Sequence, residues 1–411
     1  MNESPLQIAP IPRISIHAFC ESQNLASIVA DAQEDRRMAK AHVKSQLGGL
    51  AAALEAFRDS PTPNLIVIES RSPREDLIAG LDELAEYCDS GTKVVIVGHV
   101  NDILLYRELV SRGVSDYLVA PLSVINFIQA VSDLYAGQEG GALGRVIAVV
   151  GAKGGAGAST IAHNLAWSIA NDHDMATILV DLDLPAGTAG LDFNQDPPQG
   201  VAEAVFSPDR LDHNFVDRLL CGAGEGDKLN MLAAPATLER VYDFDEAAFD
   251  PLIDILRATT PVTVLDVPKG WNGWMRRVLV GADDVIVVAS PDLASLRNAK
   301  NVLDQLRAAR PNDRPARLVL NGVGVPKRPE IPPADFGKNV ETAPTVVIPF
   351  EPKLFGSASN NGRMVAEEEG AAKLVALFSE LSRALLGRAE ARKPKKSVLA
   401  PLLEKLNRKK A

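Results

Sequence analysis

The chain has 411 residues, enough for two or three domains. An aromatic content of 5% and a formal charge of −10 argue against a surface that coats nucleic acid or stacks bases. The three cysteines are far apart and lack metal-ligand spacing, which fits a reducing compartment and no structural metal. Neither an export signal nor an apolar stretch of about 18 residues is apparent, so we expect a cytoplasmic protein.

The first part of the chain predicts a parallel α/β domain. Residues 1–13 are rich in proline and are expected to be disordered, and residues 14–136 alternate strand-like with helix-like segments. A further strand is expected between about Ala39 and Val43, without fixed ends. Residues 137–144 read as a linker by composition. The clearer strands are Ile14–Ala18, Asn64–Glu69, Lys93–Val97 and Asp116–Val119.

This first domain resembles a response-regulator receiver whose chemistry has been removed. Glu69 stands where a receiver carries its phosphoacceptor aspartate, and Gly98 and Ala120 stand at the hydroxyl and lysine positions. The acidic pair after the first strand is reduced to Glu21. The resemblance implies a flavodoxin-like fold used for interaction or localisation. An unrelated flavodoxin-like domain, or a signalling domain run by phosphorylation, are the alternatives.

A second parallel α/β domain is predicted over residues 145–387. Its strands follow a regular alternation with helices, the last helix being about Gly370–Gly387. The predicted strands are Arg145–Val150, Thr177–Asp181, Leu229–Leu232, Val262–Asp266, Asp284–Ala289, Arg317–Asn321 and Thr345–Ile348.

Residues 152–160, Ala-Lys-Gly-Gly-Ala-Gly-Ala-Ser-Thr, form a glycine-rich loop between the first strand of this domain and a helix. Backbone N–H groups and a helix N-terminus converge on phosphate in such a setting. Compared with the ordinary phosphate loop, Ala158 replaces the lysine, and Lys153 stands near the start instead. This early lysine resembles the deviant Walker A motif of the MinD/ParA ATPases.

Further segments match that family in chain order. Val180–Gly187 resembles switch I, so that Asp181 would hold the magnesium shell and Asp183 would position the attacking water. Val262–Gly270 resembles the Walker B and switch II segment, which assigns Asp266 to magnesium and the N–H of Gly270 to a phosphate. An acidic strand end without function is the alternative for the aspartates. Trp271 and Trp274 are expected to make core or dimer contacts.

The resemblance implies ATP and Mg²⁺ as cofactors. Asn321 would pair with the adenine edge, with Pro349 beside the base, although Asn321 alone also fits a turn. Lys153 would reach the partner's nucleotide in a homodimer formed through the nucleotide face. The metal set is Ser159, Asp181 and Asp266, the catalytic set is Asp183 and Lys153, and the nucleotide set is Lys153, Gly154, Gly155, Gly157, Ala158, Ser159, Thr160, Asp181, Asp266, Gly270, Asn321 and Pro349.

The loop from Lys153 to Asn164 most resembles the CpaE/TadZ branch of Flp (tight adherence) pilus assembly proteins. This implies a dimeric ATP-binding localisation factor that contacts the pilus secretion ATPase and the inner-membrane platform, at the membrane or a cell pole. Loss of the lysine at Ala158 predicts turnover lower by about 10²–10³. A hydrolysing ParA-type ATPase that positions DNA or protein cargo is the alternative. His163 is expected on a helix face and His173 on the surface.

Residues 388–411 form a basic tail with nine basic and two acidic side chains, hence +7, which leaves −17 on the rest of the chain. Val398, Leu399, Leu402, Leu403 and Leu406 would line one helical face. An anionic membrane surface fits this pattern, and a solvated tail is the alternative. No specific nucleic-acid partner is expected.

Overall fold

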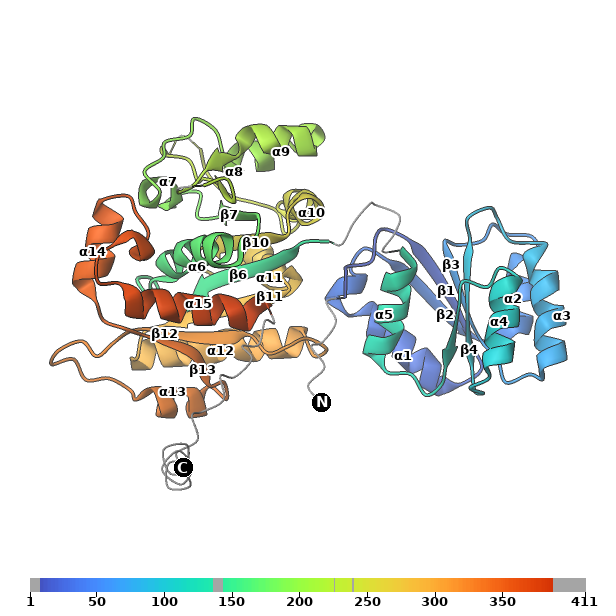
Figure 1. Cartoon of the computed structure of the whole chain (residues 1–411). Helices are drawn as coiled ribbons and strands as arrows, with labels where there is room; N and C mark the ends of the chain where they lie inside the picture. Colours follow the sequence, from blue (N-terminus) through green and yellow to red (C-terminus); the bar gives the residue numbers. More distant parts are fainter. Residues whose placement is uncertain (1–7, 136–142, 225, 239, 387–411) are drawn as a thin grey trace, which may run out of the picture.

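The computed structural model describes residues 8–135, 143–224, 226–238 and 240–386, and it contains two sheets joined in one chain (Figure 1). The first sheet has the order β2-β1-β3-β4-β5, and all of its strand pairs are parallel. The predicted fold class, two parallel α/β units in sequence, is confirmed. The strands of the first sheet are β1 (Ser15–Cys20), β2 (His42–Leu47), β3 (Leu65–Glu69), β4 (Lys93–Gly98) and β5 (Asp116–Val119).

Helices cover both faces of this first sheet. One apolar cluster joins the sheet to α1 and α5, and the other joins it to α2, α3 and α4. β3 is buried at every position because helices lie on either side of it, which is why its sequence is a continuous apolar run. The helices are α1 (Gln23–Gln33), the short η1 (Arg36–Met38), α2 (Gly49–Phe57), α3 (Arg74–Ala85), α4 (Ile103–Ser111) and α5 (Val124–Tyr135).

Two details of the first unit differ from expectation. The strand expected between about Ala39 and Val43 lies further along the chain, at His42–Leu47. The sequence did not fix its ends because it is an edge strand whose side chains are mostly exposed. The segment from residue 8 to 13 is packed: Ile11 is 1% exposed, and its N–H donates to the carbonyl of Arg37. The prediction that residues 1–13 are disordered is therefore wrong for residues 8–13.

The second sheet has eight strands in the order β13-β12-β11-β6-β10-β7-β9-β8. Only the β8–β9 pair among the described strands is antiparallel. The short edge strand β8 was missed, since two residues carry no periodic signal. The strands are β6 (Arg145–Gly151), β7 (Thr177–Asp181), β8 (Cys221–Gly222), β9 (Leu229–Leu232), β10 (Val262–Val267), β11 (Asp284–Ala289), β12 (Arg317–Val323) and β13 (Pro344–Pro349).

Apolar clusters also lie on both faces of this sheet. One contains side chains of α6 and α15, and the opposite one contains side chains of α8 to α13. The helices are α6 (Ala158–His173), α7 (Ala189–Asp192), α8 (Val201–Phe206), η2 (Pro208–Arg210), α9 (His213–Leu219), α10 (Asp250–Thr259), α11 (Gly273–Gly281), α12 (Leu293–Ala309), α13 (Pro333–Asn339), α14 (Pro352–Asn360), η3 (Val365–Glu367) and α15 (Ala372–Leu386). The predicted basic tail, and most of the predicted linker, lie outside the described residues.

A buried charge cluster joins the two units. Arg36 of η1 bonds Asp313 at 2.6 Å and approaches Asp283 at 3.4 Å, and Arg37 also pairs with Asp313. These four side chains are at most 8% exposed. Arg257 completes the cluster from the second unit through Asp283. Burial favours the neutral form of Asp313, yet the bond from Arg36 and the surrounding guanidinium charges hold its pKa below its ordinary value.

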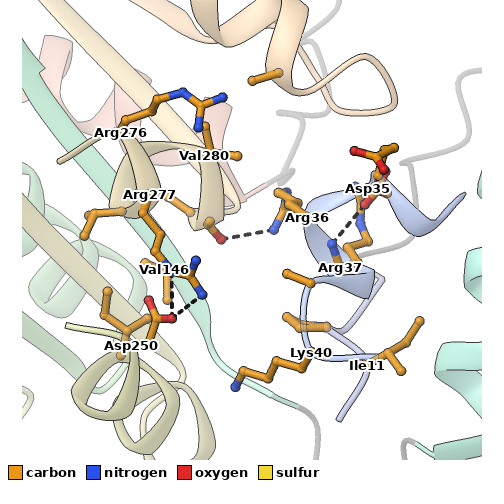
Figure 2. A pocket seen from close by; sticks show the side chains of 18 of the residues that line it. Ile11, Asp35, Arg36, Arg37, Lys40, Val146, Asp250, Arg276, Arg277 and Val280 are labelled. Atoms are coloured by element: carbon orange, nitrogen blue, oxygen red, sulfur yellow. Dashed lines mark hydrogen bonds and ion pairs between the residues drawn. The ribbon is translucent and has the colours of Figure 1, made fainter. Parts of the chain in front are cut away.

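This contact lies at the amino ends of the central strands of the second sheet. Asp283 immediately precedes β11, and its N–H donates to the carbonyl of Val146 near the start of β6. Figure 2 shows Arg36 reaching across to the second unit, beside a cavity of about 510 Å³ between the two units. The glycine-rich loop follows the carboxyl end of β6. The first unit therefore docks at the amino ends of the strands, on the side of the sheet away from that loop.

Candidate functional site

The glycine-rich loop lies between β6 and α6, as its sequence predicts. Gly155 and Gly157 have φ angles of 75° and 88°, values that side-chain-bearing residues rarely adopt. A Cβ added at Gly154 or Gly155 would meet no atom within 4 Å, so the loop opens onto free space. The first N–H groups of α6 have no partner within the helix. The loop therefore presents backbone donors to an open mouth, which fits phosphate.

Position 158 supplies no cation to this mouth. Ala158 begins α6, and Ser159 and Thr160 follow it in the first turn, all three half-buried. The first turn of α6 therefore carries two hydroxyl side chains directly after the glycine-rich loop. The N-terminus of α6 itself is equivalent to about half an elementary positive charge.

Lys153, the early lysine of the motif, is tied back within its own chain. Its Nζ bonds Asp292 Oδ2 at 2.6 Å. Asp292 also caps α12, because its other carboxylate oxygen accepts the N–H of Ser295 at 2.8 Å. Burial opposes ionisation of Asp292, but the bonds from Lys153 and Ser295 hold its pKa below its ordinary value. The resting position of Lys153 is thus a partly exposed ion pair.

Three carboxylates lie at the carboxyl ends of β7 and β10. Asp181 and Asp266 are cross-strand partners, and they are 0% and 1% exposed. Asp181 accepts the N–H groups of Asp183 and Ala189, each at 3.1 Å. Burial first, and the charge of Asp266 second, raise the pKa of Asp181 and also that of Asp183. Two buried carboxylates side by side, with the half-buried Asp183 nearby, are stabilised by a positive charge next to them.

His163 is a residue that sequence reasoning undervalued. It is fully buried rather than on an open helix face, with Nδ1 2.8 Å from Asp192 Oδ2 and Nε2 3.5 Å from Asp266 Oδ2. Burial alone would lower the pKa of His163, but the bond to Asp192 and the nearby charge of Asp266 raise it to about 10. A signal was present, since the residue four after Ser159 lies on the same side of the helix. His173 is half-buried and contacts Ser382, contrary to the surface prediction.

The predicted base-binding residues lie at the ends of the neighbouring strands β12 and β13. The amide nitrogen of Asn321 donates to the carbonyl of Ala156 at 2.9 Å, so this donor is engaged with the glycine-rich loop. Pro349 ends β13 and is half-buried. Gly270 lies in the loop after β10. Of the two tryptophans, Trp274 is 6% exposed in the core, whereas Trp271 is 45% exposed.

In the first unit, the residue at the phosphoacceptor place, Glu69, is engaged by hydrogen-bond donors of its own domain. Glu69 ends β3 and accepts bonds from the N–H groups of Glu21 and Ser22 at 2.8 and 2.7 Å, from the Ser22 hydroxyl, and from His99 at 3.0 Å. Tyr117 fills the space beside Gly98, because a Cβ there would lie 2.0 Å from the tyrosine oxygen. A small pocket beside Glu69 is lined by Ala120, which supplies no cation.

Comparison with known proteins places the chain. No family model matches it. A crystal structure of the pilus assembly protein CpaE from Caulobacter crescentus is 47% identical to 31% of this chain and is covered over 98% of its own length, with a TM-score of 0.31. That identity over nearly the whole of a relative decides the family. The chain belongs to the CpaE family of pilus assembly proteins.

More distant matches agree on the fold. A ParA family ATPase from Chlorobium tepidum has a TM-score of 0.53 at 23% identity, over 60% of this chain and 100% of its own. MinD of Pyrococcus horikoshii, solved with Mg-ADP, has a TM-score of 0.50 at 20% identity and covers 60% of this chain and 100% of its own.

Curated relatives match part of the chain. The septum site-determining protein MinD of Synechocystis is 24% identical over 60% of the chain and 90% of its own length. The chain spans about half, 47%, of an uncharacterised Mycobacterium tuberculosis protein that is 29% identical over 43% of the chain. None of the helices among the described residues is both long and apolar enough to cross a membrane.

Proposed function

We propose that this CpaE-family chain is an ATP-binding assembly and localisation factor for a Flp-type pilus secretion machine, working as a dimer with slow hydrolysis. The observation that carries the proposal is the glycine-rich loop, which keeps Lys153 and open backbone donors but has Ala158 at the lysine position. The pilus role is supported by membership of the CpaE family. Its partners would be the secretion ATPase and the inner-membrane platform, and its place the membrane or a cell pole.

The residues present fit a magnesium nucleotide. Asp266 Oδ2 is enclosed and has no hydrogen-bond partner among the described residues, as expected of an atom that meets a cation or its water. Ser159, Asp181 and Asp266 would hold the ion, which supplies neutralising charge to the phosphates. Loop residues 153–160 and Gly270 would bind the phosphates, Asn321 and Pro349 the base, and Asp183 would orient the attacking water.

Lys153 would act as the dimer sensor. Its ion pair with Asp292 leaves the two side chains 35% and 31% exposed, and exposed pairs contribute only about 0–1 kcal/mol. The phosphates of a nucleotide bound to a second copy can therefore displace Asp292 at little cost. The catalytic contribution lost at Ala158 is larger, since one preorganised charge contact changes rates by about 10²–10³.

The test measures ATP binding, dimer state by light scattering, and turnover in parallel. We expect the wild type to bind ATP with Mg²⁺, to dimerise and to turn over slowly, and Ala158→Lys to turn over about 10²–10³ faster. Lys153→Ala should still bind ATP but fail to dimerise, whereas Lys373→Ala, on the exposed side of α15, should behave as wild type. Equal turnover in wild type and Ala158→Lys, or salt-sensitive DNA binding by the dimer, would favour a ParA-type cycling ATPase instead.

A further inference from the structure

A second feature lies beneath the glycine-rich loop, where α6 packs on the ends of β7 and β10. His163, Asp181 and Asp266 each offer one ligand atom here, and these atoms all lie within 4.8 Å of one another. The three residues are 0%, 0% and 1% exposed. Unlike the phosphate mouth, this cluster is enclosed by protein.

Two atoms in the cluster have no hydrogen-bond partner among the described residues. They are His163 Nε2 and Asp266 Oδ2, both enclosed and 3.5 Å apart. An unsatisfied buried polar atom costs about 1–3 kcal/mol, and more when it is charged. Two such atoms that face one another, with a second carboxylate beside them, offer ligands to a positive ion placed between them.

The orientation of the imidazole is fixed from its other side. His163 Nδ1 lies 2.8 Å from Asp192 Oδ2, and Asp192 is held in turn by the hydroxyl of Ser359 at 3.2 Å. A carboxylate that accepts the N–H of one ring nitrogen leaves the other nitrogen free to bind a metal ion, and this is the usual arrangement of metal-binding histidines. The ring is therefore held with Nε2 directed at Asp266.

The separations suit a metal ion. Imidazole nitrogen and carboxylate oxygen bind first-row divalent ions at about 2.0–2.2 Å, which places ligand atoms around one ion about 3–4 Å apart. The 3.5 Å between His163 Nε2 and Asp266 Oδ2 falls in this range. Magnesium prefers oxygen ligands and keeps its water, whereas an imidazole favours zinc and other transition ions.

We propose that His163, Asp181 and Asp266 form a buried site for a divalent transition ion of the zinc class, occupied without nucleotide. The ion would brace α6 against the ends of β7 and β10 and place positive charge beneath the phosphate mouth that lacks a lysine at Ala158. The proposal shares two aspartates with the magnesium set but does not depend on ATP binding.

The test uses the full chain, stripped of metal with a chelator and free of nucleotide. Titration with Co²⁺ should give visible absorption that saturates at one ion per chain, and Zn²⁺ should displace it while a large excess of Mg²⁺ should not. His163→Ala should weaken Co²⁺ binding by about 100-fold or more, and Asp192→Asn by about 10–100-fold. His213→Ala removes an exposed histidine and should bind as the wild type does.

Circular dichroism and a thermal melt of each variant establish that it is folded, and His163→Gln replaces His163→Ala if the alanine variant is not. Wild type that takes up no stoichiometric Co²⁺ or Zn²⁺ would overturn the proposal, as would unchanged affinity in the folded His163 variant. ATP binding is measured on the same samples. Loss of ATP binding with Co²⁺ uptake intact would refute the proposed nucleotide function and leave the metal site standing.

Discussion

Glu69 and Asp266 occupy equivalent places in the two units and have opposite surroundings. Each lies at the carboxyl end of a central parallel strand, and each is 1% exposed. Glu69 is surrounded by donors from Glu21, Ser22 and His99. Asp266 has an oxygen with no hydrogen-bond partner in the described chain and faces Asp181. Equal burial therefore conceals a difference: the Glu69 carboxylate is satisfied by hydrogen bonds from its own domain, whereas Asp266 Oδ2 has, among the described residues, only an ion pair with His163 at 3.5 Å.

The largest expected effect comes from Glu69→Ala. It leaves the N–H groups of Glu21 and Ser22 without their acceptor in a buried setting, so we expect a loss of about 3 kcal/mol in the free energy of unfolding. Urea denaturation followed by circular dichroism measures it. Glu83→Ala, an exposed glutamate on α3, is the matched control and should change stability by less than about 0.5 kcal/mol. A loss of unfolding free energy no larger than that of Glu83→Ala would show that the hydrogen bonds to Glu69 do not stabilise the first unit.

The opposite sign is expected at the second site. Asp266→Asn removes one of two adjacent buried carboxylates, and His163 keeps Asp192 and the charge of Asp181 beside it. The ligand-free protein should therefore gain about 1 kcal/mol in the free energy of unfolding while losing stabilisation by Mg-ATP. Asp284→Asn is the control, because this buried aspartate is paired with Arg145 and its loss should destabilise. Thermal melts with and without Mg-ATP measure both effects. Destabilisation of the free protein by Asp266→Asn would contradict the comparison.

The smallest effect is a pH dependence at Glu69. Burial opposes its ionisation, but bonds from Ser22, Glu21 and His99 hold its pKa below its ordinary value. A lowered folded pKa means that the carboxylate stabilises the fold above the unfolded pKa and loses this effect as pH falls through the folded pKa. The stability gap between wild type and Glu69→Gln should therefore shrink on going from pH 7 to below about 4. Paired urea titrations would measure it, and a gap that widens in acid would refute the assignment.

The fold was predictable because its signals are local. β7 and β11 lie at the predicted residues, since strands buried on both faces read as continuous apolar runs. β2 was misplaced because an exposed edge strand lacks that pattern. The glycine-rich loop and the aspartates at the carboxyl ends of β7 and β10 were identified by motif, and the structure brings them to the same end of the sheet.

The remainder depends on contacts between distant residues. Arg36 and Asp313 meet across 277 positions, and no local pattern announces that two charged surface-type residues will be buried together. Asn321 was assigned to the base, yet its amide nitrogen supports the glycine-rich loop. The spacing of four from Ser159 puts His163 on the side of α6 that carries the loop serine, but the packed sheet ends are needed to show that it faces Asp266.

The docking of the first unit at the amino ends of β6 and β11 has a consequence for valency. Because that edge is opposite the glycine-rich loop, two chains that meet through their nucleotide faces would hold their first units at the two far ends of the assembly (Figure 1). The Arg36–Asp313 cluster would fix the span between these ends. A dimer would then carry two first units at a fixed separation. If each first unit binds a partner, the dimer would bind an assembly with repeated copies of that partner more tightly than one chain does, because the second binding event becomes intramolecular.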